Sequence, residues 1–251
     1  MRVFVILPAA GLGTRMAAGN ATPGAPKQFL ELRGTPILIH TLRAFTTLPS
    51  VAAVYIAVRK PEIARLRALL KQYEDGQYEG GQYESGDRVH IIEGGDTRQS
   101  SVANALAAVE GGDDDIVLVH DAVRPLIDAA VIARTIEAVK THGAAIVAVP
   151  AIDTIKQVER TAHGAIITAT IPREYVVQAQ TPQGFRLGLL RRAFAEAEAD
   201  GFVGTDESSI VERAGLQVAV VPGTIENLKI TQQGDLDLAE FFLSQREKPR
   251  S

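Results

Sequence analysis

Six short runs of β-branched and other aliphatic residues recur along the chain and constrain its fold more than any other feature. They are continuously apolar, as expected of strands that are covered on both faces. Amphipathic segments lie between several of them, and this alternation predicts a mostly parallel sheet flanked by helices. We therefore predict an α/β fold, a single Rossmann-like domain over residues 1–251. The six runs are 2–7, 51–58, 89–92, 116–119, 144–149 and 217–221.

Two of the amphipathic segments have clear candidate N-terminal caps. Residues 97–110 and 128–140 place apolar side chains at helical spacing. Aspartate is a favoured N-cap because its side chain accepts a hydrogen bond from a free backbone N–H of the first turn. Asp96 and Asp128 are therefore the predicted caps of these helices.

Residues 152–172 break the alternation of strands and helices. They predict two strands, Thr154 to Val158 and Ala165 to Ile171, around a Thr-Ala-His-Gly turn. An isolated hairpin is barely stable in water. We therefore expect a β-arm that projects from the main sheet and packs on a second subunit, which makes the protein a homodimer.

Two other segments are expected to lie outside the core. Residues 72–87 form a low-complexity insert that repeats Gly-Gln-Tyr-Glu at 76–79 and 81–84, which is typical of a mobile surface loop. Arg246 to Ser251 are expected to form a frayed polar tail.

Composition excludes several classes of protein. The net charge of −4 argues against a nucleic-acid-binding surface. The absence of cysteine excludes disulfides, thiolate zinc sites and a thiol nucleophile. No apolar run is long enough for a signal peptide or a membrane span. A cytoplasmic protein with no membrane partner is the resulting expectation.

The first predicted strand is followed directly by a glycine-rich loop, PAAGLGTRM at residues 8–16. Small residues there let backbone N–H groups approach a phosphate. The loop lacks the third glycine of the dinucleotide fingerprint and does not match the P-loop pattern, which argues against a dinucleotide-dependent oxidoreductase. Two nearby cations, Arg15 and Lys27, suit a triphosphate. The alternative is a tight turn with solvated basic residues.

The loop and three later motifs resemble one known family. PAAGLGTRM followed by PKQ at 26–28 is similar to the nucleotide-binding signature of sugar-phosphate nucleotidyltransferases. GGDTRQSSV at 94–102, VHDAVRP at 119–125 and NLKIT at 227–231 resemble motifs of the 2-C-methyl-D-erythritol 4-phosphate cytidylyltransferases among them. The resemblance extends from about residue 3 to residue 243. It implies magnesium-dependent transfer of CMP from CTP to that polyol phosphate in the non-mevalonate isoprenoid pathway, with release of pyrophosphate.

The resemblance also implies roles for individual residues. Arg15 and Lys27 would stabilise charge at the α-phosphate and the leaving group, and Arg173 and Lys229 would complete the catalytic set at the acceptor phosphate. Asp121 would contact the ribose or the magnesium shell. The implied CTP contacts are Ala9, Ala10, Gly11, Gly13, Gly95, Asp96, Ser101 and Asp121, and the implied acceptor contacts are Arg124, Thr154 and Thr205.

Several of these residues have simpler interpretations. Asp121 and Arg124 could form an ion pair, Arg124 could be a plain surface charge, and Lys229 could face solvent. His120 is interpreted as a packed core histidine. Thr154 and Arg173 belong to the β-arm, so they would complete the site of a partner subunit. The stretch 17–25 is longer than usual in the family, which makes the position of Lys27 uncertain.

Other functions are compatible with parts of the sequence. A ribitol 5-phosphate cytidylyltransferase would share the fold and the CTP loop, and would differ near Thr154, Arg173 and Thr205. A non-catalytic nucleotide-binding protein has no need for three phosphate-directed cations. A uridylyltransferase fused to an acetyltransferase is disfavoured because no hexapeptide repeats follow.

Overall fold

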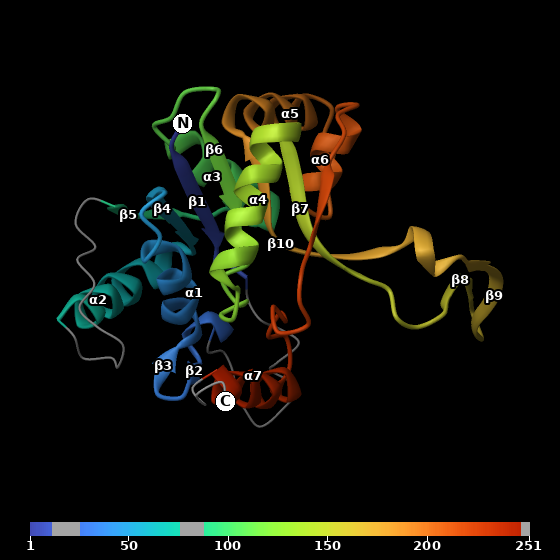
Figure 1. Ribbon diagram of the computed structural model, residues 1–251, viewed down its shortest axis with the longest axis horizontal. Helices are drawn as coiled ribbons and strands as arrows, with labels where there is room; N and C mark the ends of the chain where they lie inside the picture. The colour runs from blue at the N-terminus through green and yellow to red at the C-terminus, as the bar shows by residue number, and fades with distance from the viewer. Residues whose placement is uncertain (12–25, 76–87, 247–251) are drawn as a thin grey trace.

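A seven-stranded sheet forms the centre of the computed structural model, which describes residues 1–11, 26–75 and 88–246 (Figure 1). The strand order is β11-β7-β10-β6-β1-β4-β5. Neighbouring strands are parallel except where β10 runs antiparallel to β6 and β7. The strands are β1 (Val3–Pro8), β4 (Val51–Val58), β5 (Val89–Glu93), β6 (Ile116–Val119), β7 (Ala144–Pro150), β10 (Val177–Arg186) and β11 (Ala219–Pro222). The predicted mostly parallel sheet is confirmed, with all six predicted strands.

Helices cover both faces of this sheet because alternate residues of each strand point to opposite sides. In β1, Val5 and Leu7 pack in the cluster that contains α1, α2 and α4, whereas Phe4 and Ile6 pack with α3, α5 and α6. A third cluster joins α7 to the small β2–β3 sheet. The helices are α1 (Ile37–Thr46), α2 (Ile63–Glu74), α3 (Arg98–Ala108), α4 (Ala129–His142), α5 (Leu187–Ala199), α6 (Glu207–Arg213) and α7 (Gln233–Arg246).

Short elements complete the described chain. Among them, the 3-10 helix η1 begins at Lys27, and the 3-10 helix η2 follows β4. The short elements are η1 (Lys27–Phe29), β2 (Glu31–Leu32), β3 (Thr35–Pro36), η2 (Lys60–Glu62), β8 (Ile155–Thr161), β9 (Gly164–Ile171) and η4 (Arg173–Tyr175).

The sequence prediction missed β10, the antiparallel strand between β6 and β7. Its buried residues include Gln180, Thr181 and Gln183, which break the apolar pattern expected of a central strand. These polar groups are satisfied by partners far along the chain: Gln183 Nε2 donates to Asp206, and Gln180 Nε2 donates to Thr224 O. Burial of a polar side chain is tolerated when it is hydrogen-bonded.

Only one of the two predicted helix caps is correct. Asp128 caps α4 and accepts a 2.6 Å hydrogen bond from Ala130 N. The prediction of Asp96 as the cap of α3 is wrong, because Thr97 occupies that position. Thr97 Oγ1 accepts from Ser100 N and Ser100 Oγ accepts from Thr97 N, so the two residues form a reciprocal capping box.

The low-complexity insert and the C-terminal tail both begin inside helices. Gln72 to Glu74 form the last turn of α2, where Tyr73 is buried and its hydroxyl accepts a 2.8 Å hydrogen bond from Arg43 Nε. The loop prediction is therefore wrong for these residues, and 76–87 lie outside the described residues. Arg246 ends α7 and pairs with Glu226, so it does not belong to a frayed tail. Residues 247–251 also lie outside the described residues.

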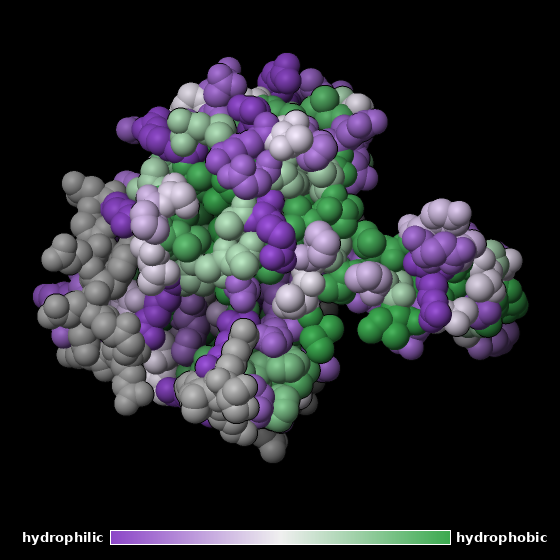
Figure 2. Space-filling view, in the orientation of Figure 1, coloured by the Kyte–Doolittle hydropathy of each residue, from purple (hydrophilic) through white to green (hydrophobic). Residues whose placement is uncertain are grey.

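The predicted β-arm is confirmed and projects far from the sheet (Figure 1). Strands β8 and β9 pair only with each other in the described structure. Apolar residues are exposed along the arm and its base, as Figure 2 shows: Ile152, Val158, Ile166, Ile167, Tyr175 and Val177. None of the helices in the described ranges is long and apolar enough to cross a membrane.

His120 is fully buried just after β6, as predicted for a packed histidine. Its ring contacts Phe45 edge-on at 5.0 Å between centroids. His120 Nε2 lies 3.1 Å from Arg124 O, which can only accept, so Nε2 carries the proton and donates. In the neutral ring Nδ1 is then an acceptor, and the Thr181 hydroxyl donates to it at 3.0 Å while accepting from Asp121 N. Burial lowers the pKa of His120 to about 4.

We predict that the protein loses stability as the pH falls from about 6.5 to about 4. The unfolded chain protonates His120 near its ordinary pKa of about 6.5, whereas the folded chain resists protonation until about pH 4. The difference corresponds to roughly 3 kcal/mol of unfolding free energy. Urea unfolding at pH 7 and pH 4.5 measures this loss. His120→Gln is expected to show a smaller loss, with a remainder from His40, whose pKa burial also lowers. An equal loss in both proteins would contradict the assignment.

Candidate active site

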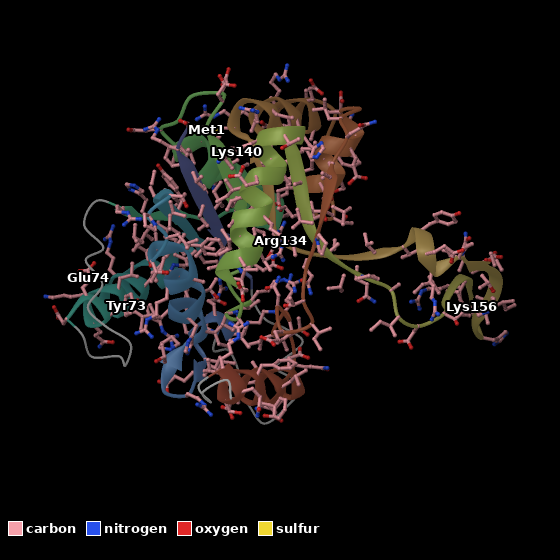
Figure 3. The ribbon with its side chains drawn as sticks, viewed as in Figure 1. Met1, Tyr73, Glu74, Arg134, Lys140 and Lys156 are labelled. Atoms are coloured by element: carbon pink, nitrogen blue, oxygen red, sulfur yellow. The ribbon has the colours of Figure 1, made fainter. Side chains whose placement is uncertain are left out.

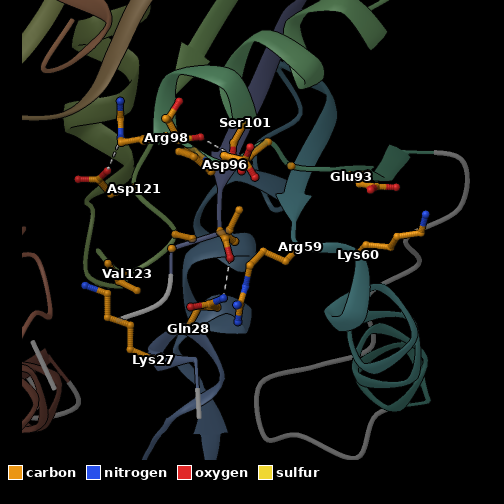
Figure 4. Close-up of a pocket in the computed structure, with 18 of the residues that line it drawn as sticks. Lys27, Gln28, Arg59, Lys60, Glu93, Asp96, Arg98, Ser101, Asp121 and Val123 are labelled. Atoms are coloured by element: carbon orange, nitrogen blue, oxygen red, sulfur yellow. Dashed lines mark hydrogen bonds and ion pairs between the residues drawn. The ribbon is translucent and has the colours of Figure 1, made fainter. Parts of the chain in front are cut away.

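A cavity of about 500 Å³ opens at the carboxyl ends of β1, β4, β5 and β6 (Figure 4). This edge of an open α/β sheet is where ligands bind. Loops after four strands therefore contribute to one site. Its lining residues are Pro8, Ala9, Ala10, Gly11, Lys27, Gln28, Arg59, Lys60, Glu93, Gly94, Gly95, Asp96, Thr97, Arg98, Ser101, Asp121, Ala122, Val123 and Lys229.

The end of β4 holds the first loop and the 94–98 loop close together. Ala9 N donates to Ala57 O and Gly94 N donates to Val58 O, both at 2.7 Å. A Cβ on Gly94 would stand 2.8 Å from the Ala10 Cβ, so only glycine fits at this approach. Gln28 Nε2 donates to Ala9 O at 2.5 Å and ties the Pro26-Lys27-Gln28 segment to the same loop.

Asp121 is the most strongly charge-paired carboxylate in the cavity. Its Oδ2 lies 3.0 Å from Lys229 Nζ and 3.1 Å from Arg124 Nε, and its Oδ1 lies 3.4 Å from Arg98 Nε. Burial alone would raise the pKa of Asp121, but attraction to these three cations outweighs it and holds the pKa well below its usual range. Asp121 is therefore ionised at neutral pH.

Arg98 is held from behind by a second carboxylate, Glu207 of α6. Its NH1 and NH2 reach the two carboxylate oxygens at 2.6 and 3.0 Å in a bidentate pair. Burial opposes the charge on Arg98, but attraction to Glu207 and then to Asp121 exceeds that effect and raises the pKa of Arg98. Burial raises the pKa of Glu207, and Arg98 counteracts part of this rise.

Most of the predicted site residues meet in this cavity. The described structure brings together Ala9, Ala10, Gly11, Lys27, Gly95, Asp96, Ser101, Asp121 and Lys229. The interpretation of Lys229 as a solvent-facing residue is wrong, because its ammonium pairs with Asp121. Gly13 and Arg15 lie outside the described residues, as does the stretch 17–25.

The predicted acceptor contacts do not line the cavity in the described part of the chain. Arg124 is buried behind Asp121, where its NH1 donates to Asn227 O at 2.7 Å. The predicted ion pair with Asp121 is confirmed, and the interpretation of Arg124 as a surface charge is wrong. Thr205 is exposed just before α6. Thr154 and Arg173 lie at the β-arm, where Arg173 NH1 donates to Ile152 O. The contacts of all four with an acceptor stay predictions.

Three basic residues in the cavity were not predicted: Arg59, Lys60 and Arg98. Arg59 and Lys60 directly follow β4, whose carboxyl end lies beside that of β1. Their position at the end of a predicted central strand could have indicated that they belong to the site. Arg59 Nε is buried and has no hydrogen-bond partner among the residues that the structure describes. Arg98 belongs to the 94–102 motif but had been given no role.

The donor set fits magnesium only as part of a nucleotide complex. The carboxylates that line the cavity are Glu93, Asp96 and Asp121, and no group of three or more His, Cys, Asp or Glu in the described ranges is arranged to hold a metal ion. Asp121 is already surrounded by three cations. Magnesium in proteins commonly takes one or two carboxylates, several waters and the phosphates of the substrate.

Comparison with known proteins agrees with this geometry. The model of the 2-C-methyl-D-erythritol 4-phosphate cytidylyltransferase family matches residues 3–245. The enzyme of that name from Acidobacterium capsulatum is 70% identical over 98% of this chain and 99% of its own length. The one from Solibacter usitatus is 49% identical, over 97% and 96%. A crystal structure of the Francisella tularensis enzyme has a TM-score of 0.75 and 34% identity, and the match covers 96% of this chain and 99% of that one. The chain therefore belongs to the family of 2-C-methyl-D-erythritol 4-phosphate cytidylyltransferases.

Proposed function

We propose that this chain transfers CMP from CTP to 2-C-methyl-D-erythritol 4-phosphate and releases pyrophosphate, in the non-mevalonate route to isoprenoid precursors. The observation that carries this proposal is the cavity at the carboxyl edge of the sheet. There, the small residues of the first loop, Lys27 and Lys229 surround one space. Backbone N–H groups and cations around a cavity suit a triphosphate that reacts with a second phosphate.

The chemistry needs positioning and charge stabilisation rather than a general base. A phosphate oxygen of the acceptor attacks the α-phosphorus of CTP, a new P–O bond forms, and the bond to the β-phosphate oxygen breaks. The electron pair leaves with pyrophosphate. Because the nucleophile is already an oxyanion, no side chain has to remove a proton. In this proposal Lys27 stabilises the charge at the α-phosphate, and Lys229 stabilises the incoming phosphate.

The nucleobase is assigned to the 94–98 side of the cavity. Recognition of cytosine needs an acceptor for its exocyclic amino group. Gly95 O and the exposed carboxylate of Asp96 are acceptors there. The Ser101 hydroxyl lies 2.8 Å from Thr97 O and 3.2 Å from Gly95 O, so its proton is shared between these two carbonyls of the loop. The triphosphate then extends toward Gly11 and Lys27.

Asp121 is the carboxylate that would hold a magnesium ion, through the water shell of the ion. When bound, the ion would supply charge neutralisation along the triphosphate. Asp121 itself orients Lys229 by the 3.0 Å ion pair, and this role depends only on residues of the chain.

A cytoplasmic location stays a prediction.

A homodimer through the β-arm completes the proposal. The exposed apolar side chains of β8 and β9 need a covering surface, because a free hairpin has little stability of its own. Thr154 and Arg173 lie at this arm, outside the cavity of their own chain. In a dimer with two-fold symmetry, each arm would bring these residues to the cavity of the partner.

The proposed reaction is tested by pyrophosphate release from CTP and magnesium with two acceptors in parallel. We expect release with 2-C-methyl-D-erythritol 4-phosphate and none with ribitol 5-phosphate. Release with ribitol 5-phosphate alone would keep the CTP site but overturn the acceptor. Silence with both acceptors, together with tight CTP binding, would favour a non-catalytic nucleotide-binding protein.

Lys27→Ala and Lys229→Ala are each expected to lower kcat about 100- to 1000-fold, because each removes a cation from developing phosphate charge. Lys140→Ala is the matched control (Figure 3). Lys140 lies in the last turn of α4, just before β7 begins, so it is at the opposite edge of the sheet from the cavity. Steady-state kinetics with thermal melting distinguishes a catalytic loss from unfolding. Near-normal rates in the Lys27 or Lys229 variant would refute its role.

Mixing two inactive variants tests the shared site. Lys27→Ala damages the cavity of its own chain, and Arg173→Ala is expected to damage the cavity of its partner. Random exchange of subunits should then produce mixed dimers with one intact site, and activity should recover to about a quarter of the wild-type value. No recovery after verified exchange would show that Arg173 acts within its own chain, and full activity of Arg173→Ala alone would show that it has no role. Sedimentation of the wild type measures the oligomeric state.

A further inference from the structure

A buried carboxylate with no assigned role stands directly behind the cavity. Glu207 is 1% exposed and does not line the cavity, yet both of its carboxylate oxygens contact Arg98, which does. A buried charge is costly unless it is paired and hydrogen-bonded. The chain therefore uses a buried carboxylate to hold one side chain of the site, Arg98, which is itself partly exposed to the cavity.

The position of Glu207 is fixed by the backbone around it. Asp206 caps α6 and forms a reciprocal capping box with Ser209. Gln183 of β10 donates to Asp206 Oδ2 at 2.8 Å and accepts from Ser208 N at 2.9 Å. The first turn of α6 is thus anchored to the central sheet, and Glu207 lies within this anchored turn.

The bidentate pair determines how Arg98 meets Asp121. Both terminal nitrogens of Arg98 are bound to Glu207, so only Nε is left for Asp121 Oδ1, at 3.4 Å. Asp121 Oδ2 is therefore left to Lys229, at 3.0 Å, and to Arg124 Nε, at 3.1 Å. The four side chains form one continuous series of charges, Glu207–Arg98–Asp121–Lys229, that ends in the cavity.

We propose that Glu207 is a positioning residue for the reaction proposed above: by holding Arg98 in a bidentate pair, it keeps Asp121 oriented to fix Lys229 at the cavity wall. Without the negative charge of Glu207, Arg98 can present its two-pronged guanidinium to Asp121, the geometry that arginine and carboxylate prefer. Arg98 would then compete with Lys229 for the carboxylate oxygens of Asp121, and Lys229 would lose its fixed place.

The test uses Glu207→Gln, which keeps the shape of the side chain and removes its charge. We expect kcat to fall about 10- to 100-fold, in line with the cost of misplacing a reacting group by about 1 Å. The KM for CTP should change little, because the assigned contacts to base and phosphates come from residues 9–11, from Lys27 and from residues 94–96. If Glu207 had only a structural role, Glu207→Gln would lower the melting temperature but would not lower kcat selectively while the KM for CTP stays the same.

A second pair of variants tests whether Glu207 acts through Arg98. Arg98→Lys keeps the positive charge but loses the fork that makes the bidentate pair. If the two residues act as a unit, the double variant Glu207→Gln with Arg98→Lys should have the same kcat as Arg98→Lys alone. If the loss of kcat in the double variant equals the product of the losses in the two single variants, the residues act independently and the proposal is overturned.

Asp115→Asn is the control for stability. Asp115 is also buried and pairs with Arg2, but it lies at the start of β6, at the opposite edge of the sheet. It should lower the melting temperature and leave kcat unchanged. A wild-type kcat in Glu207→Gln, or a loss that only follows the folded fraction, would refute the positioning role. A wild-type protein that is silent with both acceptors would instead refute the proposed function, and this inference with it.

Discussion

The charge of Asp121 is the constraint on which the site depends. A carboxylate this buried stays ionised only where cations surround it, and here three come from separate parts of the chain. Arg98 begins α3, Arg124 follows β6, and Lys229 lies in the 227–231 motif. The loops that carry these side chains must therefore close over the end of β6 in the folded state. Loss of one partner would leave buried charge unpaired, so the same contacts that build the cavity also stabilise the fold around it.

The antiparallel strand β10 connects this site to the β-arm. In sequence the arm lies between β7 and β10, which are neighbours in the sheet, and Pro150 of β7 pairs with Val177 of β10 at the base of the arm. Since β6 and β7 both run antiparallel to β10, they are parallel to each other. The arm therefore leaves the sheet at the carboxyl edge, where the cavity opens. This geometry explains why exchange of arms between two copies would bring Thr154 and Arg173 to a cavity rather than to an unrelated surface.

The sequence predicted what depends on local pattern and missed what depends on contacts between distant residues. Apolar runs identified six central strands, and most of the motif residues that the structure describes at their carboxyl ends line one cavity. β10 was missed because Gln180, Thr181 and Gln183 are polar, and the groups that satisfy them are distant in sequence. Asp96 and Thr97 are both good N-caps, so composition could not decide between them. The pair of Arg98 with Glu207 spans 109 positions, and no spacing rule relates residues so far apart.

The local charge of the cavity differs in sign from the total charge of the chain. The chain carries a net charge of −4. The described cavity lining nevertheless contains five basic residues (Lys27, Arg59, Lys60, Arg98 and Lys229) against three acidic ones (Glu93, Asp96 and Asp121), an excess of two positive charges. Arg98 and Lys229 are already paired with carboxylates, so much of their charge is neutralised by residues of the chain. A triphosphate meeting a second phosphate brings more negative charge than this excess can balance. In the proposed reaction, Arg15 and a magnesium ion are the groups predicted to balance the remaining negative charge.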